Sequence, residues 1–299
     1  MAFAMALALS RRRIVPPRRL AAVSMRLSST ISEDSSNMTH ALYFVGAPRR
    51  PEIRHDNGFL GQFRSRSPTP VDRRRYAQWQ GRLELAEAVQ GVPGAPKNDI
   101  PDALAAYRHF LTGRGAARTF SYERYVANDA SGRTTLQSAI LEAMAAAWEL
   151  HGSEVSAEGG SFSFTGSAIA CGGTTSGYPY PATENWQKAI GAHSIWISGD
   201  VVVKPVAKSS TPEFTLTLVV HAEDRYNFNP GAADIATGIP DDENGMFELT
   251  GLAKQYMNYA TLTRRVAWSG APATSFTVSM SPWLRHRQPG DNRRVRNRL

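Results

Sequence analysis

A dense group of polar side chains follows an apolar, strand-like run in FTLTLVVHAEDRYNFNPG, residues 214–231. It combines acids, asparagines, a histidine and a tyrosine, residue types that transfer protons or bind phosphate and metal ions. Functional side chains often lie where a regular element gives way to a loop. This run therefore supplies the first candidate catalytic residues, which are His221, Asp224, Tyr226, Asn227 and Asn229.

Strand alternation predicts how these side chains are divided between two faces. Leu218 and Val220 should point to one face, whereas His221 and Glu223 should point to the other. The Pro-Gly pair at 230–231 should end the strand, because proline lacks the N–H of the ladder. A structural interpretation stays open, since Asp and Asn at a strand end also cap turns and buried tyrosines are common in cores.

Neighbouring residues extend the possible site. Glu223, Asp224 and Asp234 could jointly bind Mg²⁺, which prefers carboxylate and water oxygens. His221 could then act as the base, and Arg264 or Arg265 could hold a phosphate. In an active enzyme, His221 and at least one guanidinium group should face the same cleft as Asp224.

Residues 190–270 resemble the catalytic domain of the colicin M family, on the string Asp224-x-Tyr226-x-Phe228-Asn229 with a helix and a strand after it. That resemblance implies a bacteriocin-like, magnesium-dependent hydrolase of the phosphodiester in a lipid-linked peptidoglycan precursor. The family motif has a second aspartate where this chain has Asn227. A His-Arg pair follows a few residues later in the family, where this chain has Ala233 and Asp234.

These departures leave two hypotheses for the function. The first is a toxin-like hydrolase that acts on a phosphodiester or pyrophosphate of a lipid-linked substrate. The second is a non-catalytic binding or structural module that keeps the same fold. They differ in whether carboxylates and His221 converge on one open cleft.

The elements that position this segment predict an α+β fold, with N-terminal helices followed by an antiparallel sheet and one inserted helix. Helical spacing and glycine stops predict helices over 76–89, 98–115 and 134–152. Strands are expected over 118–126, 193–206, 214–227 and 261–268, with a hairpin between the second and third. Apolar residues from Phe247 to Met257 follow helical spacing, so the inserted helix is expected over 247–260.

Four regions are expected along the chain. Residues 1–75 form a basic arm and linker, residues 76–152 a helical region, residues 153–283 a β-rich, colicin-M-like domain, and residues 284–299 a disordered basic tail. The 42% hydrophobic content fits a globular protein. No run is long and apolar enough to span a membrane. Cys171 is the single cysteine, so an intrachain disulfide is excluded, and we expect its side chain to pack in the core.

The net charge of +8 is unevenly distributed. Residues 1–32 carry six arginines and no acid, and residues 281–299 carry six arginines and one aspartate. Residues 76–280 hold fourteen basic and twenty acidic residues, so no nucleic-acid site is predicted on the core. We expect the basic tails to be solvated, with contact to anionic surfaces as the alternative.

The composition of residues 1–32 is typical of an organellar, mitochondrial-type presequence, being rich in Arg, Ser and Ala. The arginines follow the apolar run, which is the opposite of the order in a secretory signal. Pro16 and Pro17 would interrupt an amphipathic helix. A start codon placed too early, with the chain beginning at Met25 or Met38, is the other explanation, and the location stays open.

Overall fold

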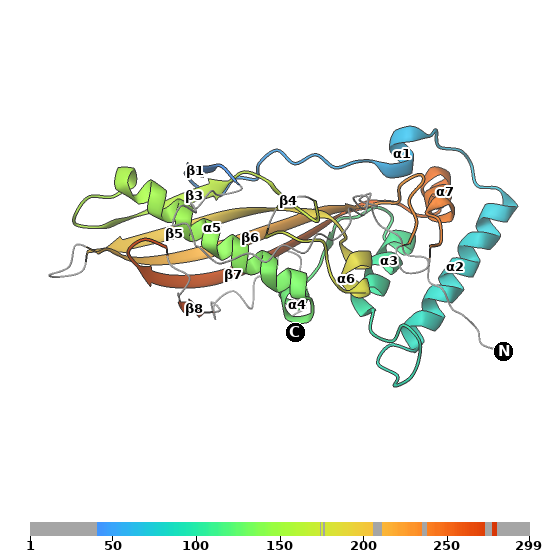
Figure 1. The fold of residues 1–299 in the computed structure, drawn as a ribbon. Helices are drawn as coiled ribbons and strands as arrows, with labels where there is room; N and C mark the ends of the chain where they lie inside the picture. Colours follow the sequence, from blue (N-terminus) through green and yellow to red (C-terminus); the bar gives the residue numbers. More distant parts are fainter. Residues whose placement is uncertain are drawn as a thin grey trace, which may run out of the picture.

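Three long antiparallel strands, β5, β6 and β7, form the middle of the fold (Figure 1). The computed structural model describes residues 41–173, 175, 177–205, 211–234, 238–272 and 277–279. Its strands are β1 (Tyr43–Val45), β2 (Arg118–Thr119), β3 (Gly160–Gly166), β4 (Ile169–Cys171), β5 (His193–Lys204), β6 (Glu213–Tyr226), β7 (Tyr256–Ser269) and β8 (Thr277–Ser279). Its helices are α1 (Gly58–Gln62), α2 (Pro70–Ala88), α3 (Pro101–Thr112), α4 (Tyr122–Asn128), α5 (Ala130–Glu154), α6 (Glu184–Ala189) and α7 (Asp242–Thr250).

The sheet confirms the expected α+β class. Its order is β1-β3-β5-β6-β7-β2, with β4 paired to β5 and β8 paired to β7. Among the described strands the pairing is antiparallel except between β2 and β7. The predicted hairpin is β5 and β6, and helix α7 lies between β6 and β7 in the sequence.

One face of the sheet carries the main core. Along β6, Leu218, Val220 and Ala222 are buried, whereas Val219 and His221 on the other face are half-buried, as the alternation predicts. Helix α5 packs against β3, β5 and β6 and covers the apolar face (Figure 1). This helix begins at its N-cap Asp129, whose side chain accepts a hydrogen bond from the Ser131 N–H at 2.8 Å.

A second apolar cluster lies at the end of the sheet where β6 stops. It joins α2, α3 and α7 through Trp79, Tyr107, Phe110, Phe228 and Phe247. Tyr226 and Tyr256 stack at this end with their ring centroids 5.1 Å apart. Helices from the first half of the chain therefore hold the segment that follows β6.

Residues 41–75 differ from the predicted linker. They form β1, α1 and the start of α2, and residues 46–58 follow the outer face of the sheet from β3 to the end of β6 (Figure 1). Residues 46–58 are called the arm below. Helix α2 begins at Thr69, whose hydroxyl accepts from the Asp72 N–H while the Asp72 carboxylate accepts from the Thr69 N–H. The local sequence pattern did not predict the path of the arm, because contacts with residues far away in the sequence hold it in place.

Two of the expected elements are wrong. Only Arg118 and Thr119 of the predicted 118–126 strand pair with β7, because Ser121 caps α4 by accepting from the Arg124 N–H at 3.2 Å. The helix expected over 247–260 ends at Thr250. Gly251 adopts a left-handed φ of 70°, and β7 begins at Tyr256.

Several expectations concern residues outside the described part of the chain. Residues 1–40 and 280–299 hold the presequence-like segment and the basic tail. Within the described residues, no helix is long and apolar enough to cross a membrane.

Candidate functional site

The arm brings His55 and Arg50 into contact with Glu223, an acid near the end of β6 on the outer face of the sheet. The Nε2 atom of His55 lies 2.8 Å from Oε1 of Glu223. The Arg50 guanidinium donates to both carboxylate oxygens, with Nε at 2.7 Å and Nη2 at 2.6 Å. The Glu223 side chain is 3% exposed and that of His55 is 8% exposed, so solvent screens this pair weakly.

These bonds fix the charge on Glu223. Burial alone would raise its pKa, but the hydrogen bonds from His55 and Arg50 lower the pKa of Glu223 to about 2. An ionised carboxylate only accepts hydrogen bonds, so Nε2 of His55 must carry a proton. A neutral His55 then has its lone pair on Nδ1, which is the arrangement of a carboxylate-oriented general base.

A second arm contact involves Asn227, which stands where the colicin M family motif that this segment resembles has an aspartate. The Asn227 amide donates to the Asp56 carboxylate and to the Asp56 backbone oxygen, the latter at 3.1 Å. Asp56 is exposed, whereas Asn227 is buried. A carboxylate from the arm therefore lies beside the position where the family motif has its second one.

Close backbone packing holds this part of the arm. Gly58 has a φ of 51°, and a Cβ built on it would lie 2.0 Å from the Phe228 backbone oxygen. The same oxygen accepts from the Phe59 N–H at 3.2 Å. Asn57 accepts a hydrogen bond from Nη1 of Arg225. Only glycine fits at position 58 in this arrangement.

Glu248 of α7 lies beneath this contact. Its Oε1 accepts from the Phe228 N–H at 3.2 Å, and its Oε2 is buried with no hydrogen-bond partner in the described part of the chain. Burial, with the nearby charges of Asp241 and Asp56, raises the pKa of Glu248 to about 9. Glu248 is therefore protonated at neutral pH.

The structure does not bring the predicted base and phosphate clamp together with Asp224. His221 lies on the outer face and Asp224 on the inner face. The His221 ring stacks on Trp196 at 3.6 Å, and its Nε2 lies 2.9 Å from the Ser198 hydroxyl. Burial lowers the pKa of His221 to about 4, so the ring is neutral near pH 7.

Arg264 and Arg265 lie farther along the sheet from the polar segment. Arg264 pairs in register with Leu218 and donates to both carboxylate oxygens of Glu123 at 2.9 Å. Arg265 is exposed on the opposite face. Leu218 precedes Asp224 by six residues, which is roughly 20 Å along a strand. Neither arginine can hold a phosphate beside Asp224.

The remaining predicted residues are mostly structural in their contacts. Tyr226 is fully buried and stacked on Tyr256, and the Asn229 N–H donates to Asp241 at 3.0 Å. Asp224 is 2% exposed on the inner face, in register with Asn258. These placements favour the structural interpretation for this part of the polar segment.

The three expected magnesium ligands do not share one site. Asp234 pairs with Lys188 at 2.8 Å, Glu223 is bonded to Arg50 and His55, and Asp224 lies on the opposite face. The described residues hold no group of three or more His, Cys, Asp or Glu side chains that could bind a metal ion. The residues therefore do not fit the expected joint site, and a magnesium requirement stays a prediction.

A pocket of about 490 Å³ adjoins the Arg50 contact. It lies between β1, the arm and the end of β3, and its lining includes Arg49, Arg50 and Thr165. Phe44 and Val45 supply apolar side chains that are 61% and 45% exposed. The pocket thus combines basic and apolar groups, and Arg50 links it to Glu223.

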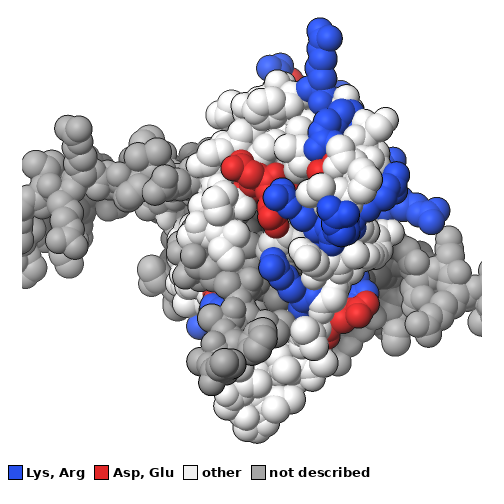
Figure 2. All heavy atoms as spheres, turned by 90° about the vertical axis from the view of Figure 1, so that its right-hand side faces the viewer, with Lys and Arg blue, Asp and Glu red and all other residues white. Residues whose placement is uncertain are grey.

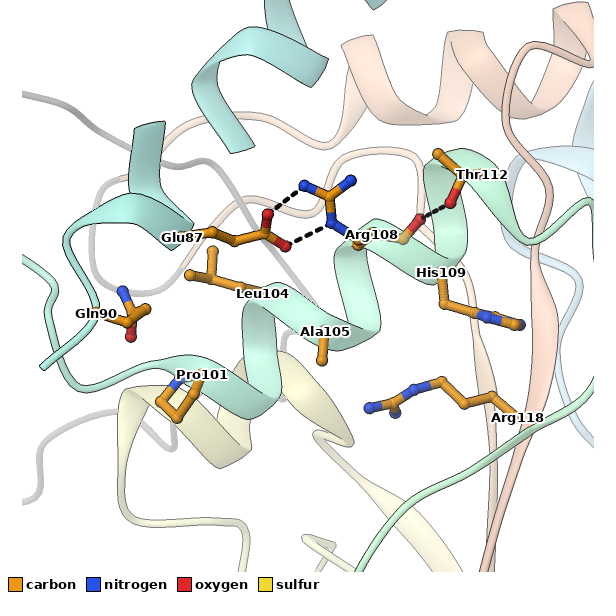
Figure 3. A pocket seen from close by; sticks show the side chains of 9 residues that line it. All are labelled: Glu87, Gln90, Pro101, Leu104, Ala105, Arg108, His109, Thr112 and Arg118. Carbon is orange, nitrogen blue, oxygen red and sulfur yellow. Dashed lines mark hydrogen bonds and ion pairs between the residues drawn. The ribbon is translucent and has the colours of Figure 1, made fainter. Parts of the chain in front are cut away.

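A pocket of about 560 Å³ lies along α3 and is lined by basic groups that are already bonded (Figure 3). Arg108 pairs with Glu87, and His109 Nε2 lies 2.7 Å from the Ala116 backbone oxygen. Arg118 donates to Asn258 at 3.3 Å. This pocket lacks a carboxylate-oriented histidine and is the weaker candidate.

Comparison with known proteins gives one structural match to report. The structure is similar to that of PaeM, a colicin M-like bacteriocin produced by Pseudomonas aeruginosa. The match has 18% identity and a TM-score of 0.31 and covers 61% of this chain and 57% of that chain. A likeness of this degree does not establish an activity. No protein-family model and no curated protein matches the chain.

Sequence reasoning missed Arg50, His55 and Asp56, which lie in the predicted linker. The available signal was the string RHDNG at 54–58, a histidine and an acid followed by a glycine. That string lacks a helical or strand period, and its partners follow more than 160 residues later.

Proposed function

We propose that this chain is a phosphodiester hydrolase in which the arm supplies the proton-transfer group. The His55–Glu223 contact of 2.8 Å carries the proposal. A buried, ionised Glu223 accepts from Nε2 of His55 and so orients the imidazole for proton transfer. Asp56 supplies a carboxylate beside Asn227, where this chain lacks the second aspartate of the motif. His55 supplies a histidine beside Glu223, whereas the histidine position of the motif is occupied by Ala233.

The reaction joins a water oxygen to phosphorus and breaks the bond from phosphorus to the leaving oxygen. His55 takes the proton from the attacking water, and the leaving oxygen departs with the bonding electron pair. Negative charge grows on the phosphate oxygens during this step. Arg225, which lies on the outer face with its guanidinium bonded to Asn57, and Arg49, which lines the pocket, are the cations that would oppose that charge.

The pocket next to Arg50 supports a lipid-linked phosphate as the substrate class. Arg49 would attract the phosphate groups, whereas exposed Phe44 and Val45 would contact the apolar chain of the lipid. The motif resemblance to the colicin M family implies the same substrate class.

A non-catalytic binding module is the second candidate, and one observation favours it. The Arg50 guanidinium already donates two hydrogen bonds to Glu223, so it offsets much of the carboxylate charge that would support proton transfer by His55. A module of this kind would bind the phosphate ligand without breaking it.

Incubation with a lipid-linked pyrophosphate, with and without Mg²⁺, separates the two candidates. The hydrolase produces new phosphate species in ³¹P NMR, and Glu223→Gln slows their appearance about 100-fold or more. The matched control Glu149→Gln removes an exposed acid on α5 and leaves the rate unchanged. Binding without any new phosphorus species, with or without the metal, would select the binding module.

A further inference from the structure

Large apolar side chains are exposed where α1 leads into α2. Leu60 is 38% exposed, Phe63 50% and Val71 45%. Phe63 lies beside the second core, with its ring centroid 5.7 Å from that of Phe59. Apolar side chains gathered this way on a surface indicate an interaction site.

The outward face of α2 continues this pattern. Asp72, Trp79, Leu83 and Ala86 form its buried stripe. Steps of three, four or seven residues place a second, exposed set on the side of the helix that adjoins this stripe, and this set consists of Val71, Arg74, Gln78, Arg82 and Leu85. Val71 at the start of this set and Leu85 at its end are both exposed, Leu85 by 59%. Arg74 and Arg82 lie between them.

Arginine dominates the charge of this region. Residues 60–85 contain six arginines and two acids. Asp72 is paired with Arg66 at 2.7 Å, and Arg75 lies 3.9 Å from Glu243 of α7. Figure 2 views this end of the molecule and shows Lys and Arg side chains gathered with few acids among them.

We propose that this α1–α2 surface, defined as the exposed residues of 60–85, docks on an anionic lipid bilayer. Arginines would contact the headgroups while Leu60, Phe63 and Val71 enter the interface, as in amphipathic helices at membrane surfaces. A nucleic acid is the less suitable partner, because its phosphate backbone offers nothing to these aliphatic and aromatic side chains.

The surface lies at the same end of the molecule as the candidate site. Helix α7 contacts both α1 and α2 (Figure 1). Asp56 lies two residues before the start of α1. Docking would therefore bring Asp56 and Asn57 near the headgroups. The docking proposal rests on the exposure and charge of this surface and does not depend on the proposed hydrolysis.

Vesicle sedimentation of the full chain tests the proposal. Vesicles of phosphatidylcholine with phosphatidylglycerol are compared with vesicles of phosphatidylcholine alone, and binding is expected only to the first. Arg64→Gln with Arg74→Gln should weaken binding about tenfold or more, and Phe63→Ser should weaken it further. The charge-matched control, Arg133→Gln with Lys204→Gln, removes two exposed cations elsewhere and should bind like the wild type.

Three results would overturn the proposal. Equal losses in the test and control variants would assign the binding to overall charge. Unchanged binding of the Arg64 and Arg74 variant would assign it to other parts of the chain. Retention on duplex DNA without retention on anionic vesicles would identify a nucleic-acid surface. Circular dichroism of each variant checks that the fold is kept.

Discussion

His55 and Glu223 lie 168 residues apart in the sequence, yet their side chains meet at 2.8 Å on the outer face of the sheet. Arg50 binds the same carboxylate. Glu223, at the end of β6, therefore holds the arm through two of its side chains, His55 and Arg50. The proposed site is consequently shared between the arm and the strand.

Gly58 is expected to control the position of that arm. Gly58→Ala would place a Cβ 2.0 Å from the Phe228 oxygen at a φ of 51°, which should cost about 1–3 kcal/mol. We expect a lower free energy of unfolding in urea and a loss of hydrolysis, because His55 and Asp56 move.

The matched control for Gly58→Ala is Gly81→Ala in α2, where nothing lies within 4 Å of the added Cβ. That change should stabilise the protein by about 0.5–1 kcal/mol, because alanine favours a helix. Equal stability of the Gly58 and Gly81 variants would contradict the close packing of the arm.

Glu248 should make stability fall as the pH rises. Its pKa is about 9 in the folded protein against an ordinary 4.5, so between these values the folded state holds a proton that the unfolded state has lost. The free energy of unfolding then falls with rising pH by up to about 1.4 kcal/mol per unit from this group.

Glu248→Gln should remove that slope and raise the stability at pH 8, as measured by urea unfolding at several pH values. Glu84→Gln changes an exposed acid and should leave the slope as in the wild type. A Glu248→Gln protein with an unaltered slope would show that the buried carboxyl is ionised.

Substitution of Asp234 distinguishes its role as an ion-pair partner of Lys188 from its expected role as a magnesium ligand. Asp234→Asn takes one carboxylate from buried Lys188, which keeps Glu184 at 2.6 Å, and should lower the free energy of unfolding by about 1–3 kcal/mol. Asp242→Asn, at an exposed position in the first turn of α7, should change it by less than about 0.5 kcal/mol. Unchanged stability together with weaker Mg²⁺ binding in a metal titration would restore Asp234 as a ligand.

The fold was predictable where one local pattern decided it. Alternation along β6 predicted its inner and outer residues, and the apolar stripe of α3 predicted a helix closed by Gly113. The segment around Gly251 was not predictable in this way. Apolar spacing continues past this glycine, but its left-handed φ ends α7, and pairing with β6 makes the following residues a strand.

The candidate site was predictable only on the strand side. Glu223 stood in the recognised polar segment, whereas its partners come from an aperiodic arm. Nothing in the local sequence of residues 46–58 specifies contacts more than 160 residues away. His221 was the obvious candidate base, because it precedes the motif directly, yet it is stacked on Trp196 and bonded to Ser198.

The central claim is that His55 transfers the proton, and the kcat of His55→Gln on a lipid-linked pyrophosphate tests it most directly. We expect a decrease of about 10²–10⁴-fold with KM little changed, since glutamine can still donate to Glu223 but cannot take a proton. His221→Gln is the comparison and should keep kcat within a few fold of the wild type. A His55→Gln protein with the full kcat of the wild type would contradict the account.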